Sequence, residues 1–85
     1  MKLISTNGLE EDLVVECDTL LTGTFNGNLT VLPGAKLCLD AKLNGDLYLR
    51  KNSIVSIQNT IVGNVYNEGG KIEMIGLIEG KLIEV

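Results

Sequence analysis

The amino-acid sequence predicts an all-β protein, a small triangular parallel β-helix (β-solenoid) with about 18 residues per coil. Two observations predict it. A glycine-containing step recurs at a regular spacing, and within each repeat apolar and polar residues alternate with the period of two that is typical of strands. No stripe with the period of a helix persists, and the 10 glycines in 85 residues indicate many tight turns.

The recurring step defines the register of the coils. It reads Gly27-Asn28-Leu29, Gly45-Asp46-Leu47 and Gly63-Asn64-Val65, with the same spacing between successive copies. Gly80-Lys81-Leu82 comes one position earlier than this spacing requires, so we place one deletion in the Asn67–Lys71 turn. Apolar residues then fall into four main columns: Phe25, Leu43, Ile61 and Ile78; Leu29, Leu47, Val65 and Leu82; Leu37, Val55 and Ile72; Leu39, Ile57 and Met74.

The stacking of parallel strands explains these columns. Neighbouring strands lie about 4.8 Å apart, so each inward aliphatic side chain rests on its equivalent in the next coil. A single coil buries almost nothing, so several must stack and the end coils need caps. We expect one domain over residues 1–85, with regular coils over 24–85. Residues 1–23 are expected to form an irregular first coil and an N-terminal cap, in which Leu3, Ile4 and Leu9 pack as a lid.

The handedness of the helix follows less directly from the pattern. Apolar residues also recur at every sixth position from Phe25 to Ile61, which suits the left-handed hexapeptide helix of acyltransferases. However, no glycine follows any of these residues. In the left-handed helix, the residue four positions after each of them should also be small. In one of every three cases it is instead a large aliphatic residue: Leu29, Leu47 or Val65. The pattern therefore favours a right-handed helix over the left-handed alternative.

Composition argues against several classes of function. There is no histidine to act as a general base, and Cys17 and Cys38 have no histidine to activate a thiolate, so we expect no enzyme, catalytic residue, cofactor or metal site. The net charge of −4 argues against a nucleic-acid partner. No apolar run reaches the length of about 18 residues needed for a transmembrane helix, and the start does not resemble a signal peptide, so the expected location is cytoplasmic.

Two polar features have simple structural explanations. The acidic run Glu10-Glu11-Asp12 is more typical of a solvated loop than of a cation site. Asn28, Asp46 and Asn64 form a column beside the glycines. Side-chain stacking or hydrogen bonds at the corners explain this column better than a calcium ladder does.

An outward column of side chains is a candidate partner-binding strip. It contains Thr30, Tyr48 and Tyr66 and continues to Ile83. Tyrosine is enriched at protein interfaces, so the strip could bind a partner. The alternative is that the stacked side chains only stabilise neighbouring strands.

The C-terminal coil differs from the earlier coils in its outward positions. Ile75, Leu77, Ile83 and Val85 are apolar there, whereas earlier coils have Asp40 and Gln58 aligned with Ile75. This switch predicts a surface for self-association, because an open end also exposes unpaired strand edges. The alternative is a local repacking in which the deletion is misplaced.

The recurring Gly-[Asp/Asn]-[Leu/Val] step, as in Leu43–Leu47 and Ile61–Val65, resembles the bactofilins, polymer-forming cytoskeletal proteins of bacteria. The resemblance covers roughly residues 23–85 and implies a right-handed triangular β-helix that polymerises end to end without nucleotide. The chain is shorter than typical members and lacks their polar or Pro-rich tails, so a dimer or a short polymer is expected.

Three functions are compatible with these features of the sequence. The first is a non-enzymatic structural protein that self-associates through its C-terminal coil. The second is a small acidic binding protein that neutralises one protein partner, such as a toxin immunity protein. The third, a fragment of an acyltransferase, is disfavoured because the chain is short and has no histidine.

Overall fold

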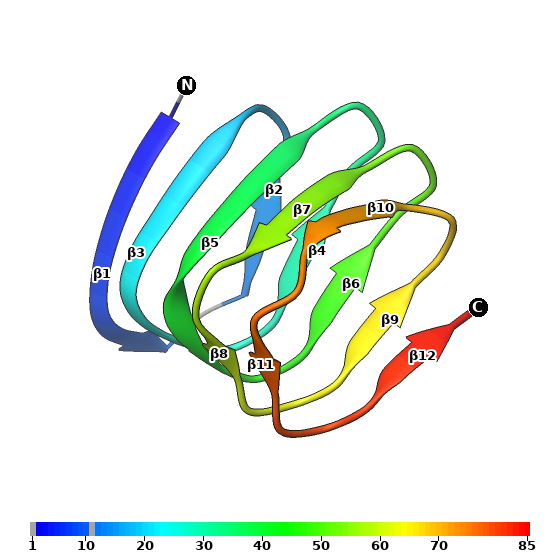
Figure 1. Ribbon diagram of the computed structural model, residues 1–85. Coiled ribbons are helices and arrows are strands. Elements are labelled where there is room, and N and C mark those ends of the chain that lie inside the picture. The colour runs from blue at the N-terminus through cyan, green and yellow to red at the C-terminus, as the bar shows by residue number, and fades with distance from the viewer. Residues whose placement is uncertain (1, 11) are drawn as a thin grey trace.

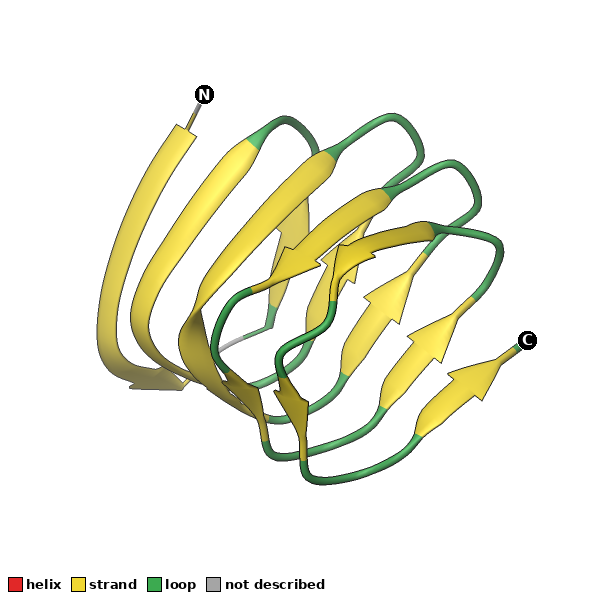
Figure 2. Ribbon diagram, viewed as in Figure 1, coloured by secondary structure: helices red, strands yellow, loops and turns green. Residues whose placement is uncertain are grey.

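The computed structural model describes residues 2–10 and 12–85, apart from the side chains of 7–10. The described residues form strands and turns without a helix (Figure 2). One sheet of seven strands contains β1 (Lys2–Glu10), β3 (Thr19–Asn26), β5 (Lys36–Asn44), β7 (Ile54–Ile57), β8 (Thr60–Ile61), β10 (Lys71–Met74) and β11 (Leu77–Ile78). The other, of five strands, contains β2 (Leu13–Val15), β4 (Leu29–Val31), β6 (Leu47–Leu49), β9 (Val65–Asn67) and β12 (Leu82–Glu84).

The strands stack as coils of a parallel β-solenoid, as the repeat predicts. Every recorded strand pair is parallel, and the second sheet has the order β12-β9-β6-β4-β2. In Figure 1, β5 and β7 run downward in front of β4, while β4, β6 and β9 run upward as the chain advances from left to right. This is the sense of a right-handed coil.

The strand register confirms most of the predicted columns. Leu29 pairs with Leu47, Leu47 with Val65, and Val65 with Leu82. Leu49 pairs with Asn67 at the regular spacing of the repeat, whereas Ile54 pairs with Lys71, one position short of that spacing. The deletion therefore falls in the Asn67–Lys71 turn, as predicted.

The inward columns form one aliphatic core between the two sheets. Each fully buried side chain of this size contributes about 1.5–3 kcal/mol of hydrophobic free energy. Because the coils repeat, like side chains rest on one another within each column. The fully buried large side chains are Leu21, Phe25, Leu29, Val31, Leu37, Leu39, Leu43, Leu47, Leu49, Val55, Ile57 and Ile61.

Glycine is required where successive coils approach closely at one corner. A Cβ atom on Gly63 would overlap the carbonyl oxygen of Gly45, and one on Gly45 would overlap that of Gly27. Gly80 has the same relation to Gly63. The recurring glycine is thus a steric requirement of backbone packing at this corner.

A ladder of side-chain oxygens follows the glycines. The Oδ1 atom of Asp12 accepts a hydrogen bond from the backbone N–H of Asn28 (3.0 Å), and Asn28 Oδ1 accepts one from Asp46 (3.0 Å). Asp46 Oδ1 accepts from the N–H of Asn64, and Asn64 Oδ1 from that of Lys81 (both 2.9 Å). The prediction of corner hydrogen bonds is confirmed.

This ladder gives a stability prediction. Asp46→Ala leaves the partly buried N–H of Asn64 without its acceptor, so we expect a loss of about 1–2 kcal/mol of unfolding free energy. Asp46→Asn keeps an oxygen in place and is expected to cost much less. Urea denaturation of both variants measures the difference, and equal losses would contradict the role of Oδ1.

The first coil departs from the regular spacing. Lys2 pairs with Thr19, one position short of that spacing, and a bulge between Asn7 and Leu9 brings Leu9 opposite Phe25, two positions short of it. Ile4 packs against the core as expected, but the expectation for Leu3 is wrong, because it points outward and is 68% exposed. The side chain of Leu9 lies outside the described residues.

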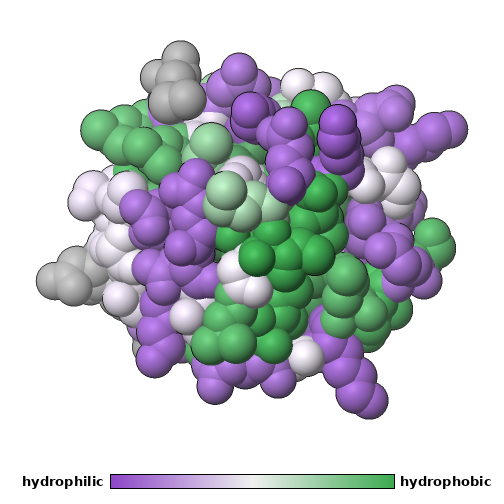
Figure 3. All heavy atoms as spheres, in the orientation of Figure 1, coloured by the Kyte–Doolittle hydropathy of each residue, from purple (hydrophilic) through white to green (hydrophobic). Residues whose placement is uncertain are grey.

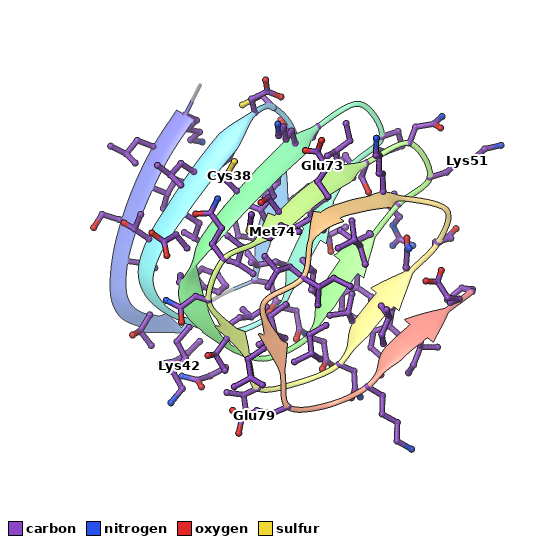
Figure 4. The ribbon with its side chains drawn as sticks, in the orientation of Figure 1. Cys38, Lys42, Lys51, Glu73, Met74 and Glu79 are labelled. Carbon is purple, nitrogen blue, oxygen red and sulfur yellow. The ribbon has the colours of Figure 1, made fainter. Side chains whose placement is uncertain are left out.

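The last coil contains a bulge that the sequence pattern did not reveal. Ile72 pairs with Val55, but Met74 pairs with Ser56 rather than Ile57, so the inward placement of Met74 is wrong and its side chain is exposed. The bulge lies at Glu73. Its carboxylate lies 3.2 Å from the ammonium group of Lys36 on β5, which is separated from β10 by β7. Figure 4 labels Glu73 and Met74.

Candidate functional site

The open C-terminal end of the solenoid exposes apolar side chains, and we call this surface the C-terminal face. Leu77 is 60% exposed and Val85 is 79% exposed. Figure 3 shows a continuous hydrophobic area over β10 and β11 with hydrophilic side chains around it. The face consists of Ile72, Met74, Ile75, Leu77, Ile78, Leu82, Ile83 and Val85.

The N-terminal end is covered to a greater degree. Val15, an inward residue of the first coil, is only 2% exposed, and Thr6 is also buried. Ile4 and Leu13 are partly buried against the core. At the other end of the same column as Leu13, Leu82 is 40% exposed. The inward side chains of the last coil are therefore more exposed to solvent than those of the first coil.

The last strand also leaves backbone groups without partners from the next coil. The carbonyl of Lys81 accepts from the N–H of Val65, and the N–H of Val85 donates to the carbonyl of Asn67. Successive residues of a strand direct these groups to opposite edges. The N–H and C=O groups of Leu82 and Glu84 consequently point to the open edge of β12.

The predicted self-association residues all belong to this face. Ile75, Leu77 and Val85 are exposed, and Ile83 is partly buried beside Tyr66. Leu77 pairs with Thr60, which agrees with the aligned register. The sequence analysis assigned the other four residues of the face to the interior and so missed their exposure at this end: Ile72, Met74, Ile78 and Leu82. An inward residue of an end coil has no following coil to cover it, and this signal could have identified Leu82.

The predicted strip runs along the outer side of the second sheet. Thr30 pairs with Tyr48, Tyr48 with Tyr66, and Tyr66 with Ile83, and Val14 extends the column at the other end. We call these five residues the tyrosine strip. The rings of Tyr48 and Tyr66 stack with their centroids 5.0 Å apart and their planes 9° apart.

The tyrosine strip has no charged side chain of its own. Desolvation and the nearby carboxylate of Asp46 raise the pKa of the Tyr48 phenol, so this group is neutral at physiological pH. The Tyr66 hydroxyl accepts a hydrogen bond from Nδ2 of Asn64 at 3.3 Å. Because the two rings stack, each covers one face of the other, which favours a stabilising role beside any binding role.

Charge is distributed unevenly along the solenoid. Residues 1–18 contain one lysine and five acidic residues, whereas residues 19–85 contain six basic and six acidic residues. The net charge of −4 therefore comes entirely from the first coil. The C-terminal face lies in a nearly balanced region, where Lys71 and Lys81 accompany Glu73, Glu79 and Glu84.

Two thiols and an ion-paired lysine lie elsewhere on the solenoid. Cys17 is an exposed free thiol, and Cys38 is a partly buried one that points outward between Leu37 and Leu39. Lys36 forms an ion pair with Glu73, whose hydrogen bond and charge raise the pKa of the lysine. The described residues contain no group of three or more potential metal ligands. Of the run Glu10-Glu11-Asp12, only the side chain of Asp12 is described, and it belongs to the corner ladder.

The fold defines the class of the protein as a parallel β-solenoid. A scan against protein-family models, a search of curated proteins and a search of solved structures each gave no match. None of the described segments is a helix long and apolar enough to cross a membrane.

Proposed function

We propose that this β-solenoid, which resembles the bactofilins, is a non-enzymatic structural protein that self-associates through its C-terminal face into a dimer or a short polymer. The exposed apolar side chains of the last coil carry the proposal. Monomeric proteins rarely expose large continuous apolar patches, because their burial against another surface is favourable. The cytoplasm is the compartment in which we expect this association.

A second copy of the chain is the occupant that fits the C-terminal face best. The face ends in strand edges, and the matching partner for such an edge is another strand. The local charges nearly balance, so two copies of this end do not repel each other strongly. A domain of 85 residues has a small core, and association supplies further burial of apolar surface.

Light scattering after size-exclusion chromatography tests the proposal. We expect an assembly of at least twice the 9.2 kDa chain mass, formed in a concentration-dependent manner. Leu77→Glu places a charge in the apolar face and is expected to weaken association by about a hundredfold or more. Val62→Glu is the control, since Val62 is 39% exposed but lies outside the face. A wild-type chain that stays monomeric at tens of micromolar would overturn the proposal.

The charge distribution favours one alternative function, a small acidic protein that neutralises one basic partner such as a toxin. The concentration of negative charge in the first coil would steer a basic protein toward the solenoid. The Thr30, Tyr48 and Tyr66 positions of the tyrosine strip would supply the contact surface. Co-purification should then recover a basic partner that is lost in Tyr48→Ser and at high salt. Recovery of the chain alone would count against this function.

A further inference from the structure

We propose that self-association is closed: two copies pair tail to tail about a twofold axis through β12, with Ile83 of each copy opposite Ile83 of the other. This inference rests on the proposed function and specifies its geometry. It predicts a dimer that cannot extend into a filament. The geometry of the open edge, the side chains of the last coil and the differences between the two ends each support it.

The open edge of β12 is self-complementary. Leu82 and Glu84 direct their N–H and C=O groups away from β9, and Ile83 lies between them. In an antiparallel pair centred on Ile83, Leu82 of one copy faces Glu84 of the other. Facing residues of this kind exchange both backbone hydrogen bonds, and the central pair exchanges none. One twofold axis therefore satisfies all of these free backbone groups in both copies.

Of the three strands in the last coil, β12 is the most regular, which is why we place the pairing there. β10 contains the bulge at Glu73, and bulges bend a strand and disrupt its pairing edge. β11 has only two residues, Leu77 and Ile78. β12 pairs with β9 over three consecutive residues without a bulge. Of these strands, β12 is therefore best suited to pair with a strand of another copy.

The side chains of the last coil complement one another in this arrangement. The twofold axis places the β10 side of one copy over the β11 side of the other, which covers the exposed inner row. The two Ile83 side chains meet on the outer surface. The tyrosine strips of the two copies then form one continuous column that ends at each Val14.

Head-to-tail stacking is opposed by features at both ends of the solenoid. Lys2 pairs with Thr19 in the inward column that leads to Ile72, so the next copy would place a lysine on Ile72. The ladder of side-chain oxygens also ends at Lys81, which has no oxygen to offer the backbone N–H of the next Asp12. The inner row of the N-terminal end is already largely covered.

Head-to-head pairing is opposed by charge. The first coil carries the whole net charge of −4, so two such coils in contact would place like charges together. Repulsion between close charges is weakly screened, because the Debye length at physiological ionic strength is about 8 Å. The C-terminal face is thus the end at which two copies can meet.

Disulfide trapping tests the geometry in a Cys17→Ser, Cys38→Ser background, whose mass should match that of the wild-type assembly. Facing residues in an antiparallel pair have Cα atoms about 4.5–5.5 Å apart, within the range of about 4.4–6.8 Å for a disulfide. We expect Ile83→Cys to give a covalent dimer on mild oxidation and Val14→Cys to give none. A chain with both substitutions should also stop at the dimer.

The cross-linking and light-scattering results distinguish a wrong dimer geometry from a failure of self-association itself. If the chain with both Val14→Cys and Ile83→Cys formed covalent trimers and larger oligomers, the copies would stack head to tail and the closed dimer would be wrong. Covalent dimers of Val14→Cys alone would indicate head-to-head pairing. A non-covalent dimer in which Ile83→Cys does not cross-link would overturn pairing centred on β12. These three results leave self-association intact. A monomer by light scattering in every variant would overturn the proposed function as well.

Discussion

Gly63→Ala is expected to abolish the cooperative fold, or to lower the unfolding free energy by at least about 4 kcal/mol. The new Cβ atom would overlap the carbonyl oxygen of Gly45 and approach Oδ1 of Asp46. The obstruction is backbone, so it can be relieved only by separating two coils. Separation breaks the ladder bond between Asp46 and Asn64 and uncovers the core beside it. Circular dichroism with urea denaturation measures the loss.

Gly34→Asn is the matched control for this prediction. Gly34 has a φ of +84°, which asparagine tolerates better than most residues, and a Cβ atom there would meet nothing within 4 Å. We expect a change below about 1 kcal/mol, because only local backbone strain is involved. If Gly63→Ala and Gly34→Asn were equally stable, the glycine corner would not constrain the stacking of coils.

Much of the fold could be predicted because one repeat carries several independent constraints. The glycine step, the aliphatic columns and the Asn/Asp column all require the same spacing along the chain, and each corresponds to a physical contact between coils. The deletion in the Asn67–Lys71 turn was also predictable, since Gly80 and Leu82 mark where the spacing resumes.

The irregular parts could not be predicted because their causes are local. The bulge at Glu73 shifts Met74 by one position, while the apolar pattern around it still looks regular. A bulge changes which side chains face inward without changing the composition of the strand. The first coil likewise has a bulge near Leu9, where no glycine step marks the register.

The candidate site was predictable in part for a related reason. Apolar residues at outward positions, such as Leu77 and Ile83, stand out against their polar equivalents in earlier coils. Leu82 does not stand out, because its inward position is apolar in every coil. Its exposure depends on the absence of a further coil in the structure, which a column alignment does not express.

A charge swap at Ile83 gives the largest expected effect on assembly. Ile83→Lys alone and Ile83→Glu alone should each be monomeric, since a twofold axis through this residue places like charges opposite each other at a cost of several kcal/mol. A mixture of the two chains should form a dimer, because the lysine of one copy then faces the glutamate of the other. Light scattering of the separate and mixed samples measures this rescue.

Val14 provides the matched control, because it is an exposed aliphatic residue at the opposite end of the same tyrosine strip. Val14→Lys and Val14→Glu should each dimerise as the wild type does, separately and mixed. If dimers formed only when the Val14→Glu chain was mixed with the Ile83→Lys chain, the first coil of one copy would lie on the last coil of another. That result would indicate head-to-tail stacking. Rescue of the dimer by mixing thus depends on Ile83 of one copy facing Ile83 of the other. A general change in net charge or stability would not produce this rescue.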